Sequence, residues 1–103
     1  MTEPLQTFAV YATYVADAVN RRAPYREAHL ARARQLHAEG TLLWAGAMGE
    51  PVDSALLIFR ARSIAEVRAL LDDDPYVLAG LWPTIVIKPW HVVIGDLSAA
   101  AGT

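Results

Sequence analysis

An arginine and two histidines share one face of a helix that the sequence predicts over residues 24–39. At 100° per residue the face falls within an arc of roughly 120°, the width of a core-facing stripe. Its members are Arg26, His29, Leu30, Ala33, Leu36 and His37. Each buried polar group without a partner costs about 1–3 kcal/mol. We therefore expect His29 to have a partner elsewhere in the chain, and Asp74 is the candidate.

His29 and Asp74 each have a plain interpretation and a functional one. A single buried histidine often bonds only a backbone carbonyl, and Asp74-Pro75 is a common way to begin a turn after a helix. As a pair, however, they resemble a general acid–base group, because a carboxylate beside an imidazole fixes its tautomer. We therefore predict that the two side chains meet and that they are catalytic.

Four further residues are predicted to contact a substrate. Arg22 and Arg26 could hold an anionic group, although solvated arginines are the simpler alternative. Tyr76 lies two residues beyond Asp74 and is expected to line a pocket together with Tyr14. Aromatic residues of this kind belong by default to a core or an interface.

No cofactor and no metal ion are expected. His29 and His37 lie eight residues apart, two helical turns, which is too far for one zinc ion. His37, near the predicted end of its helix, is expected to be structural, either as a cation at the helix end or as a partner of a backbone carbonyl. The chain has no cysteine, no glycine-rich phosphate loop and no serine–histidine–aspartate arrangement around a nucleophile elbow.

The composition excludes several classes of protein. The chain has 103 residues, 54% of them hydrophobic and 19% charged, with a net charge of −2. This charge argues against a nucleic-acid partner. No apolar run approaches the ~18 residues of a membrane span. Residues 1–4 lack the basic and apolar regions of a signal peptide. A cytoplasmic protein is therefore expected.

The chain is expected to form one domain over residues 1–103, with a core at about 5–95 and a flexible tail at 96–103. Ser63 and Glu66 form a capping box, and Gly40 suits a left-handed helix end. The second helix is expected to bury Ile64, Val67, Leu70 and Leu71. Strands are predicted at 5–15, 41–48, 54–60 and 84–94, helices at 24–39 and from 63, and a loop with one helical turn at 74–83.

This order predicts an α+β fold, a ferredoxin-like βαββαβ arrangement whose two helices cover one face of a four-stranded antiparallel sheet. Both faces of the second and third strands are apolar. The uncovered face should therefore pack on a second copy of the chain. We predict a homodimer joined sheet to sheet, with Trp44 or its neighbours in the seam. Pro89 places the last strand at an edge or a bulge.

Four segments of the chain together resemble the YciI family. They are Arg26-x-Ala28-His29-Leu30, the stretch Leu36-His37-Ala38-Glu39-Gly40-Thr41-Leu42-Leu43-x-Ala45-Gly46, then Asp74-Pro75-Tyr76-Val77-x-Ala79-Gly80, and Lys88-Pro89-Trp90. The resemblance implies a dimeric α+β barrel with a histidine and an aspartate as an active-site pair, here His29 and Asp74. The chain departs from the family at Ala47, where proline is frequent, and in the short hairpin that follows.

Two functions remain in view. The first is a small cofactor-independent enzyme, of lyase or isomerase type, in which His29 and Asp74 move protons on a small aromatic or lactone-like molecule. The alternative is a non-catalytic dimer that binds a small molecule or assists another protein. A structural interaction module is a third possibility. An internal cavity of a few hundred Å³ that reaches His29 would favour the first two.

Overall fold

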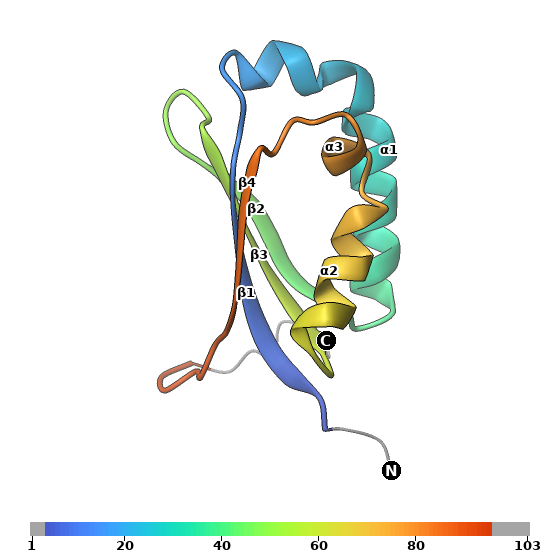
Figure 1. The fold of residues 1–103 in the computed structure, drawn as a ribbon, viewed down its shortest axis with the longest axis vertical. Coiled ribbons are helices and arrows are strands. Elements are labelled where there is room, and N and C mark those ends of the chain that lie inside the picture. The colour runs from blue at the N-terminus through green and yellow to red at the C-terminus, as the bar shows by residue number, and fades with distance from the viewer. Residues whose placement is uncertain (1–3, 96–103) are drawn as a thin grey trace.

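The fold is a four-stranded antiparallel sheet covered on one face by helices. A computed structural model describes residues 4–95, so the segment expected to be a flexible tail, 96–103, lies outside the described residues. Figure 1 shows the sheet nearly edge-on with the helices beside it. The elements are β1 (Gln6–Thr13), α1 (Ala18–Ala38), β2 (Leu42–Met48), β3 (Ser54–Ala61), α2 (Ile64–Asp72), α3 (Pro75–Leu78) and β4 (Thr84–Pro89).

The strand order β2-β3-β1-β4 is that of the predicted ferredoxin-like arrangement. Alternate residues of β1 and β3 face the helices and form the core with Val67 and Leu71 of α2, because successive strand side chains point to opposite faces. The strand residues of this core include Phe8, Val10, Leu57 and Phe59. No helix within residues 4–95 is long and apolar enough to span a membrane.

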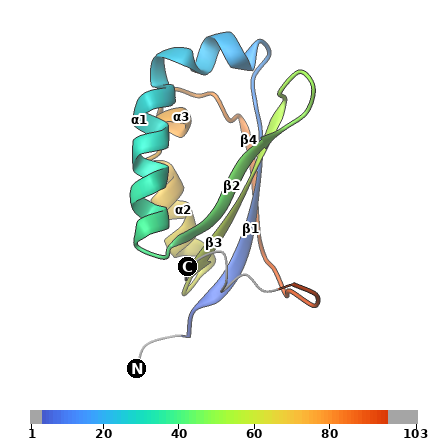
Figure 2. The same ribbon diagram turned by 180° about the vertical axis from the view of Figure 1, so that it is seen from behind.

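The first helix begins six residues earlier than the sequence predicted. It starts at Ala18, so Pro24 lies inside α1 and not at its first turn. Proline removes one backbone hydrogen bond and clashes with the preceding turn, which bends a helix. Figures 1 and 2 show the early part of α1 running across one end of the sheet before the helix turns to run along it. The prediction was wrong because a proline that bends a helix looks in sequence like a proline that starts one.

The end of α1 and the start of α2 agree with the predicted caps. Gly40 adopts a φ of 81°, and the N–H of Thr41 donates to the carbonyl of Leu36 at 3.0 Å, which closes the helix end. The Ser63 hydroxyl accepts a hydrogen bond from the N–H of Glu66 at 3.1 Å. Ile64 and Leu70 were expected to be buried, but Ile64, the first residue of α2, is exposed and Leu70 is only partly buried.

The last strand is shorter than predicted. β4 ends at Pro89, five residues before the expected boundary at 94, because proline has no N–H to continue the ladder. β4 is an edge strand, as Pro89 indicated. The segment after β4 extends to the side of the sheet opposite the helices (Figures 1 and 2).

The sheet face opposite the helices is apolar, as predicted, but it is not wholly bare. Leu43 and Ile58 are buried on this face, where Val92 from the segment after β4 packs against them. The rest of the face stays open within the chain, and Trp44 is 52% exposed there. The other exposed apolar side chains of these strands are Tyr11, Met48, Leu56 and Val86.

Candidate active site

His29 and Asp74 meet as the sequence predicted. His29 lies in the middle of α1 and is buried. Its Nδ1 is 2.9 Å from Oδ1 and 3.1 Å from Oδ2 of Asp74, which is also buried. An ionised carboxylate can only accept a hydrogen bond, so Nδ1 of the neutral ring carries the proton and donates it. The other ring nitrogen, Nε2, is then left as a free proton acceptor.

Asp74 is held in place by the start of a one-turn helix. It is the N-cap of α3, and its Oδ1 accepts a second hydrogen bond, from the backbone N–H of Tyr76 at 2.8 Å. Pro75 occupies the first turn of α3, where its missing N–H costs nothing. Asp74 therefore both begins the turn after α2 and contacts His29, since its Oδ1 accepts both hydrogen bonds.

Two aromatic rings contact the His29 imidazole, and a third packs against both of them. The ring of Tyr76 stacks on it, with centroids 3.8 Å apart and an interplanar angle of 8°. Trp82 meets the imidazole edge-on at 5.7 Å, and Tyr14 lies within 6.0 Å of both Tyr76 and Trp82. This packing fixes the orientation of the imidazole, which a general base requires.

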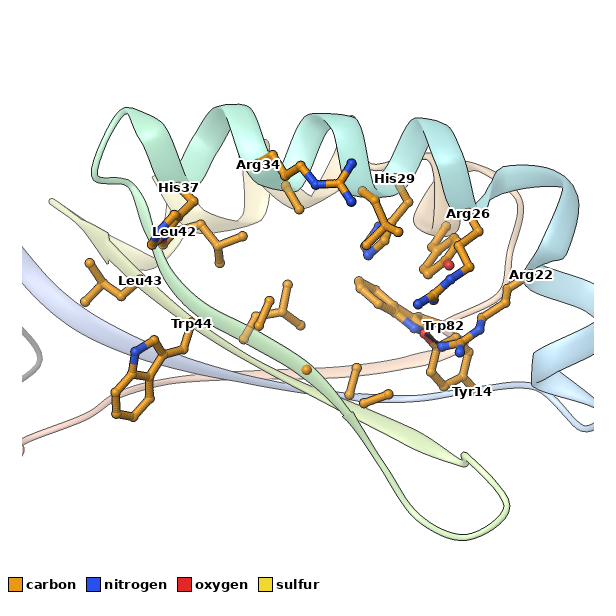
Figure 3. Close-up of a pocket in the computed structure, with 18 residues that line it drawn as sticks. Tyr14, Arg22, Arg26, His29, Arg34, His37, Leu42, Leu43, Trp44 and Trp82 are labelled. Atoms are coloured by element: carbon orange, nitrogen blue, oxygen red, sulfur yellow. Dashed lines mark hydrogen bonds between the residues drawn. The ribbon is translucent and has the colours of Figure 1, made fainter. Parts of the chain in front are cut away.

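A pocket of about 530 Å³ lies between α1 and the sheet and reaches His29 (Figure 3). Its floor includes small side chains of β2 and β3, namely Ala45, Ala47 and Ala55. The full lining is Tyr14, Arg22, Arg26, His29, Leu30, Ala33, Arg34, His37, Leu42, Leu43, Trp44, Ala45, Gly46, Ala47, Ala55, Leu57, Tyr76 and Trp82.

Five of the six residues on the α1 face that the sequence assigned to the core line a pocket, while Ala33 and Leu36 pack against the hydrophobic core. Of these six residues only His29 is buried, while Leu30, Ala33 and Leu36 are partly exposed and Arg26 is exposed. The short side chains of β2 cannot reach across to the helix, so the space between them stays open.

The pocket is positively charged. Arg22, Arg26 and Arg34 line it, and among its described lining residues there is no aspartate or glutamate. In a chain of net charge −2 this is a local excess of positive charge. Nη1 of Arg22 donates to the Tyr14 hydroxyl at 3.0 Å, and its guanidinium carbon lies 5.5 Å from the centre of that ring. Figure 3 shows Arg22 and Arg26 at one end of the pocket and His37 at the other.

Tyr76 keeps its proton more firmly than an ordinary tyrosine. Burial raises the pKa of its phenol above 10.0, and the positive charges of Arg26 and Arg22 oppose that rise without cancelling it. The Arg26 guanidinium approaches the phenol closely enough to lower this pKa, but the contact lacks good hydrogen-bond geometry, so the Tyr76 hydroxyl has no well-formed partner among the described residues. At neutral pH the phenol is therefore a neutral donor.

The other histidines lie apart from the pair. Nδ1 of His37 is 2.8 Å from the carbonyl oxygen of Leu42 in β2, which agrees with the carbonyl-bonding alternative, although His37 also lines the pocket. His91 is exposed beyond β4. Within residues 4–95 no three histidine or carboxylate side chains lie close enough together to hold a metal ion.

The structure thus brings the predicted site residues together. Arg22, Arg26, Tyr14 and Tyr76 line the pocket with His29, and Asp74 lies behind the imidazole. Sequence reasoning missed two kinds of residue. Arg34 lies two turns beyond Arg26, and this spacing could have placed it near the same face. The small residues 45–47 form the floor, and a run of small side chains in a strand was the available signal.

Comparison with known proteins agrees with the resemblance seen in the sequence motifs. Residues 7–91 match the sequence model of the YCII-related domain. The protein YciI of Escherichia coli O6:H1 is 38% identical over 96 residues, covering 84% of this chain and 97% of YciI. An uncharacterised protein of Haemophilus influenzae is 30% identical over 95 residues, with the same coverage of each chain.

A solved structure shares the fold. It is the 5-chloro-2-hydroxyhydroquinone dehydrochlorinase TftG of Burkholderia phenoliruptrix AC1100 in complex with 2,5-dihydroxybenzoquinone. The two chains superpose with a TM-score of 0.71 at 22% sequence identity, covering 82% of this chain and 93% of the other. The α+β architecture predicted from the sequence is therefore also that of a solved protein.

Proposed function

Because this chain belongs to the YCII-related family, with the fold of a known dehydrochlorinase, we propose that it is a small-molecule enzyme that moves a proton on its substrate with His29 and Asp74. The observation that carries the proposal is the contact between these two side chains at a pocket of about 530 Å³. A pocket of that size is typical of small-molecule sites.

In the proposed step, Nε2 of His29 removes a proton from a substrate carbon, and Asp74 orients the ring through Nδ1. The electron pair of the broken C–H bond forms a carbon–carbon double bond. Two outcomes follow: a leaving group departs with its own electron pair from the neighbouring carbon, or the proton returns at another position. The first outcome is a lyase reaction, the type named for the structurally similar dehydrochlorinase, and the second is an isomerase reaction.

The pocket supports an anionic, aromatic or lactone-like substrate. Arg22 and Arg26 would bind the negative charge, and Tyr14 and Tyr76 would contact a flat ring. Such a substrate needs no cofactor for the step, because its own carbonyl oxygen, in a lactone or in the keto form of a phenol, accepts the charge that deprotonation leaves. A filled interior would have favoured a purely structural role, so the pocket argues against that alternative.

The functional unit in this proposal is a cytoplasmic homodimer joined through the open sheet face. Trp44 connects this face to the site, because it lines both the substrate pocket and a groove of about 260 Å³ on the outer side of the sheet. Leu56 and Met48 share that groove. An exposed apolar surface of this kind is typical of interfaces between protein chains.

The proposal is tested by proton exchange and elimination. The protein would be incubated in D₂O with 5-chloro-2-hydroxyhydroquinone and with a panel of phenols and lactones, and NMR would follow loss of carbon-bound protons and release of chloride. We expect His29→Gln to react more slowly than the parent by a factor on the order of 10²–10⁴, the usual contribution of a general base. His91→Gln is the matched control, since that histidine is exposed and away from the pocket.

Equal rates for parent and His29→Gln would contradict the catalytic role. Tight binding of a panel compound with no exchange or elimination would support the alternative, a non-catalytic small-molecule-binding or accessory dimer.

A further inference from the structure

Three polar atoms at one end of the pocket have no hydrogen-bond partner. They are Oη of Tyr76, Nε1 of Trp82 and Nε of Arg22, and all three side chains line the pocket. Tyr76 is 0% exposed and Trp82 is 5% exposed, so both side chains are shielded from bulk solvent. Among residues 4–95 these are the buried side-chain nitrogen and oxygen atoms that lack a partner.

Such atoms are costly, and their grouping is informative. Each buried polar group without a partner disfavours folding by about 1–3 kcal/mol. All three can donate a hydrogen bond, and the indole and guanidinium nitrogens can do nothing else. Their side chains adjoin one another, because the rings of Tyr76 and Trp82 are 5.6 Å apart and Arg22 is bonded to Tyr14, which touches both rings.

From this arrangement we infer that Tyr76, Trp82 and Arg22 bind one substrate oxygen that carries negative charge, the phenolate or enolate oxygen of a cyclic substrate. The inference rests on the proposed function, which it deepens by naming the group recognised. The three residues are called the donor cluster below.

The donors suit a single oxygen better than a larger anion. Nη1 of Arg22 is already bonded to Tyr14, so the Nη1/Nη2 end of this guanidinium is not free for a carboxylate or phosphate, and Nε is its buried donor without a partner. Tyr76 and Trp82 each offer one hydrogen on a rigid ring. Three single donors from three side chains match the arrangement that stabilises an oxyanion in other enzymes.

The position of the cluster fits the chemistry of His29. Tyr76 and Trp82 both contact the imidazole ring, so an oxygen bound by them lies close to the base. When His29 takes a proton from the carbon next to a carbonyl group, the electron pair of the C–H bond forms a carbon–carbon double bond, and the π pair of the C=O bond moves to the oxygen, which becomes an enolate or, in an aromatic ring, a phenolate. The raised pKa of Tyr76 supports this role, because the phenol must keep its proton in order to donate it. The exposed Arg26 side chain beside the phenol can turn aside to admit the substrate.

Binding of 4-nitrophenolate, a coloured phenolate, tests the inference without turnover. Its affinity would be measured by absorbance and calorimetry at a pH where the phenol is ionised. We expect Tyr76→Phe and Trp82→Phe each to weaken binding by roughly tenfold or more, the value of a hydrogen bond to a charged group. Tyr11→Phe and Trp90→Phe make the same changes at exposed positions outside the pocket, and both should bind within about twofold of the parent.

A second comparison uses 4-nitroanisole, which has the same ring but no ionisable oxygen. The parent should bind 4-nitrophenolate at least about tenfold more tightly, because a neutral ether oxygen gains less from three donors. Equal affinities, or no binding of the phenolate, would overturn the inference. A melting temperature of Tyr76→Phe several degrees below that of the parent would also overturn it, because the hydroxyl would then be structural. We expect the melting temperature of Tyr76→Phe to be unchanged or higher.

Failure of the enzyme proposal would be distinguishable. A parent that binds the phenolate through Tyr76 and Trp82 but exchanges no carbon proton would refute the proposed catalysis and support the donor cluster. If the parent is active, but Tyr76→Phe and Trp82→Phe bind the phenolate as tightly as the parent, the proposed catalysis is supported and the donor cluster is refuted.

Discussion

Asp74 accepts two hydrogen bonds that substitutions can separate. Its carboxylate accepts one hydrogen bond from Nδ1 of His29 at 2.9 Å and another from the backbone N–H of Tyr76 at 2.8 Å. Asp74→Asn keeps an oxygen for Tyr76 and so keeps the helix cap, because asparagine is about as good an N-cap as aspartate. Asp74→Ala removes both acceptors. The two variants therefore separate the anchoring of α3 from the orientation of His29.

The structure gives the expected size of each effect. Asp74→Asn replaces both charge-assisted hydrogen bonds by neutral ones, at a cost of about 1 kcal/mol or less for each. Asp74→Ala should lose roughly 0.5–2 kcal/mol more, the usual value of an N-cap. In a domain of this size 1 kcal/mol lowers the melting temperature by about 4–8 °C. Thermal unfolding followed by circular dichroism measures the difference directly.

Both variants should lose the proposed activity by a factor on the order of 10²–10⁴. The amide of asparagine can donate to Nδ1 of His29, which would move the ring proton to Nε2 and remove the base. The ¹⁵N chemical shifts of His29 report this change of tautomer without any substrate. If Asp74→Asn kept turnover within about threefold of the parent, or left the tautomer unchanged, the assigned role of Asp74 would be wrong.

Three further predictions concern the pocket, the titration of the site and the assembly. Ala47→Leu should fill the pocket floor and lower turnover on the order of 10²-fold, because small misplacement of a substrate is costly. Met48→Leu, at the next position, should not lower turnover. Equal rates in these two folded variants would contradict the placement of the site. Burial raises the pKa of Tyr76 above 10.0, so the folded state holds this proton more tightly than the unfolded state and stability should fall as the pH rises above about 10. Tyr76→Phe should flatten that decline in a series of melting curves, and an unchanged slope would argue against it. Trp44→Asp should shift the protein from dimer to monomer in sedimentation, since an exposed tryptophan that becomes buried at an interface is a frequent hot spot. A parent that already sediments as a monomer at micromolar concentration would refute the sheet-to-sheet dimer.

Several features could be predicted because they depend on a few neighbouring residues. The glycine at position 40 adopts the left-handed conformation that the end of a helix requires, and Ser63 caps the helix that follows it. The alternation of apolar residues in the strands and the order of elements then leave the ferredoxin-like sheet as the simple topology. Even the contact between His29 and Asp74 was accessible, because a histidine on an apolar helix face and an aspartate at a helix end both need partners.

Only the tertiary structure shows that a pocket lies beside the pair of His29 and Asp74. The sequence placed the α1 stripe against a packed core, but the bend near Pro24 and the short side chains of β2 leave a pocket there. Trp82 looked in sequence like an ordinary core aromatic, and its unpaired nitrogen became apparent only when its neighbours were known. Periodicity and capping are local properties of the chain, whereas a cavity and an unmet hydrogen bond depend on the distances between segments remote in sequence. For that reason the sequence determined which residues could do the chemistry, and packing determined the space and the donors available to a substrate.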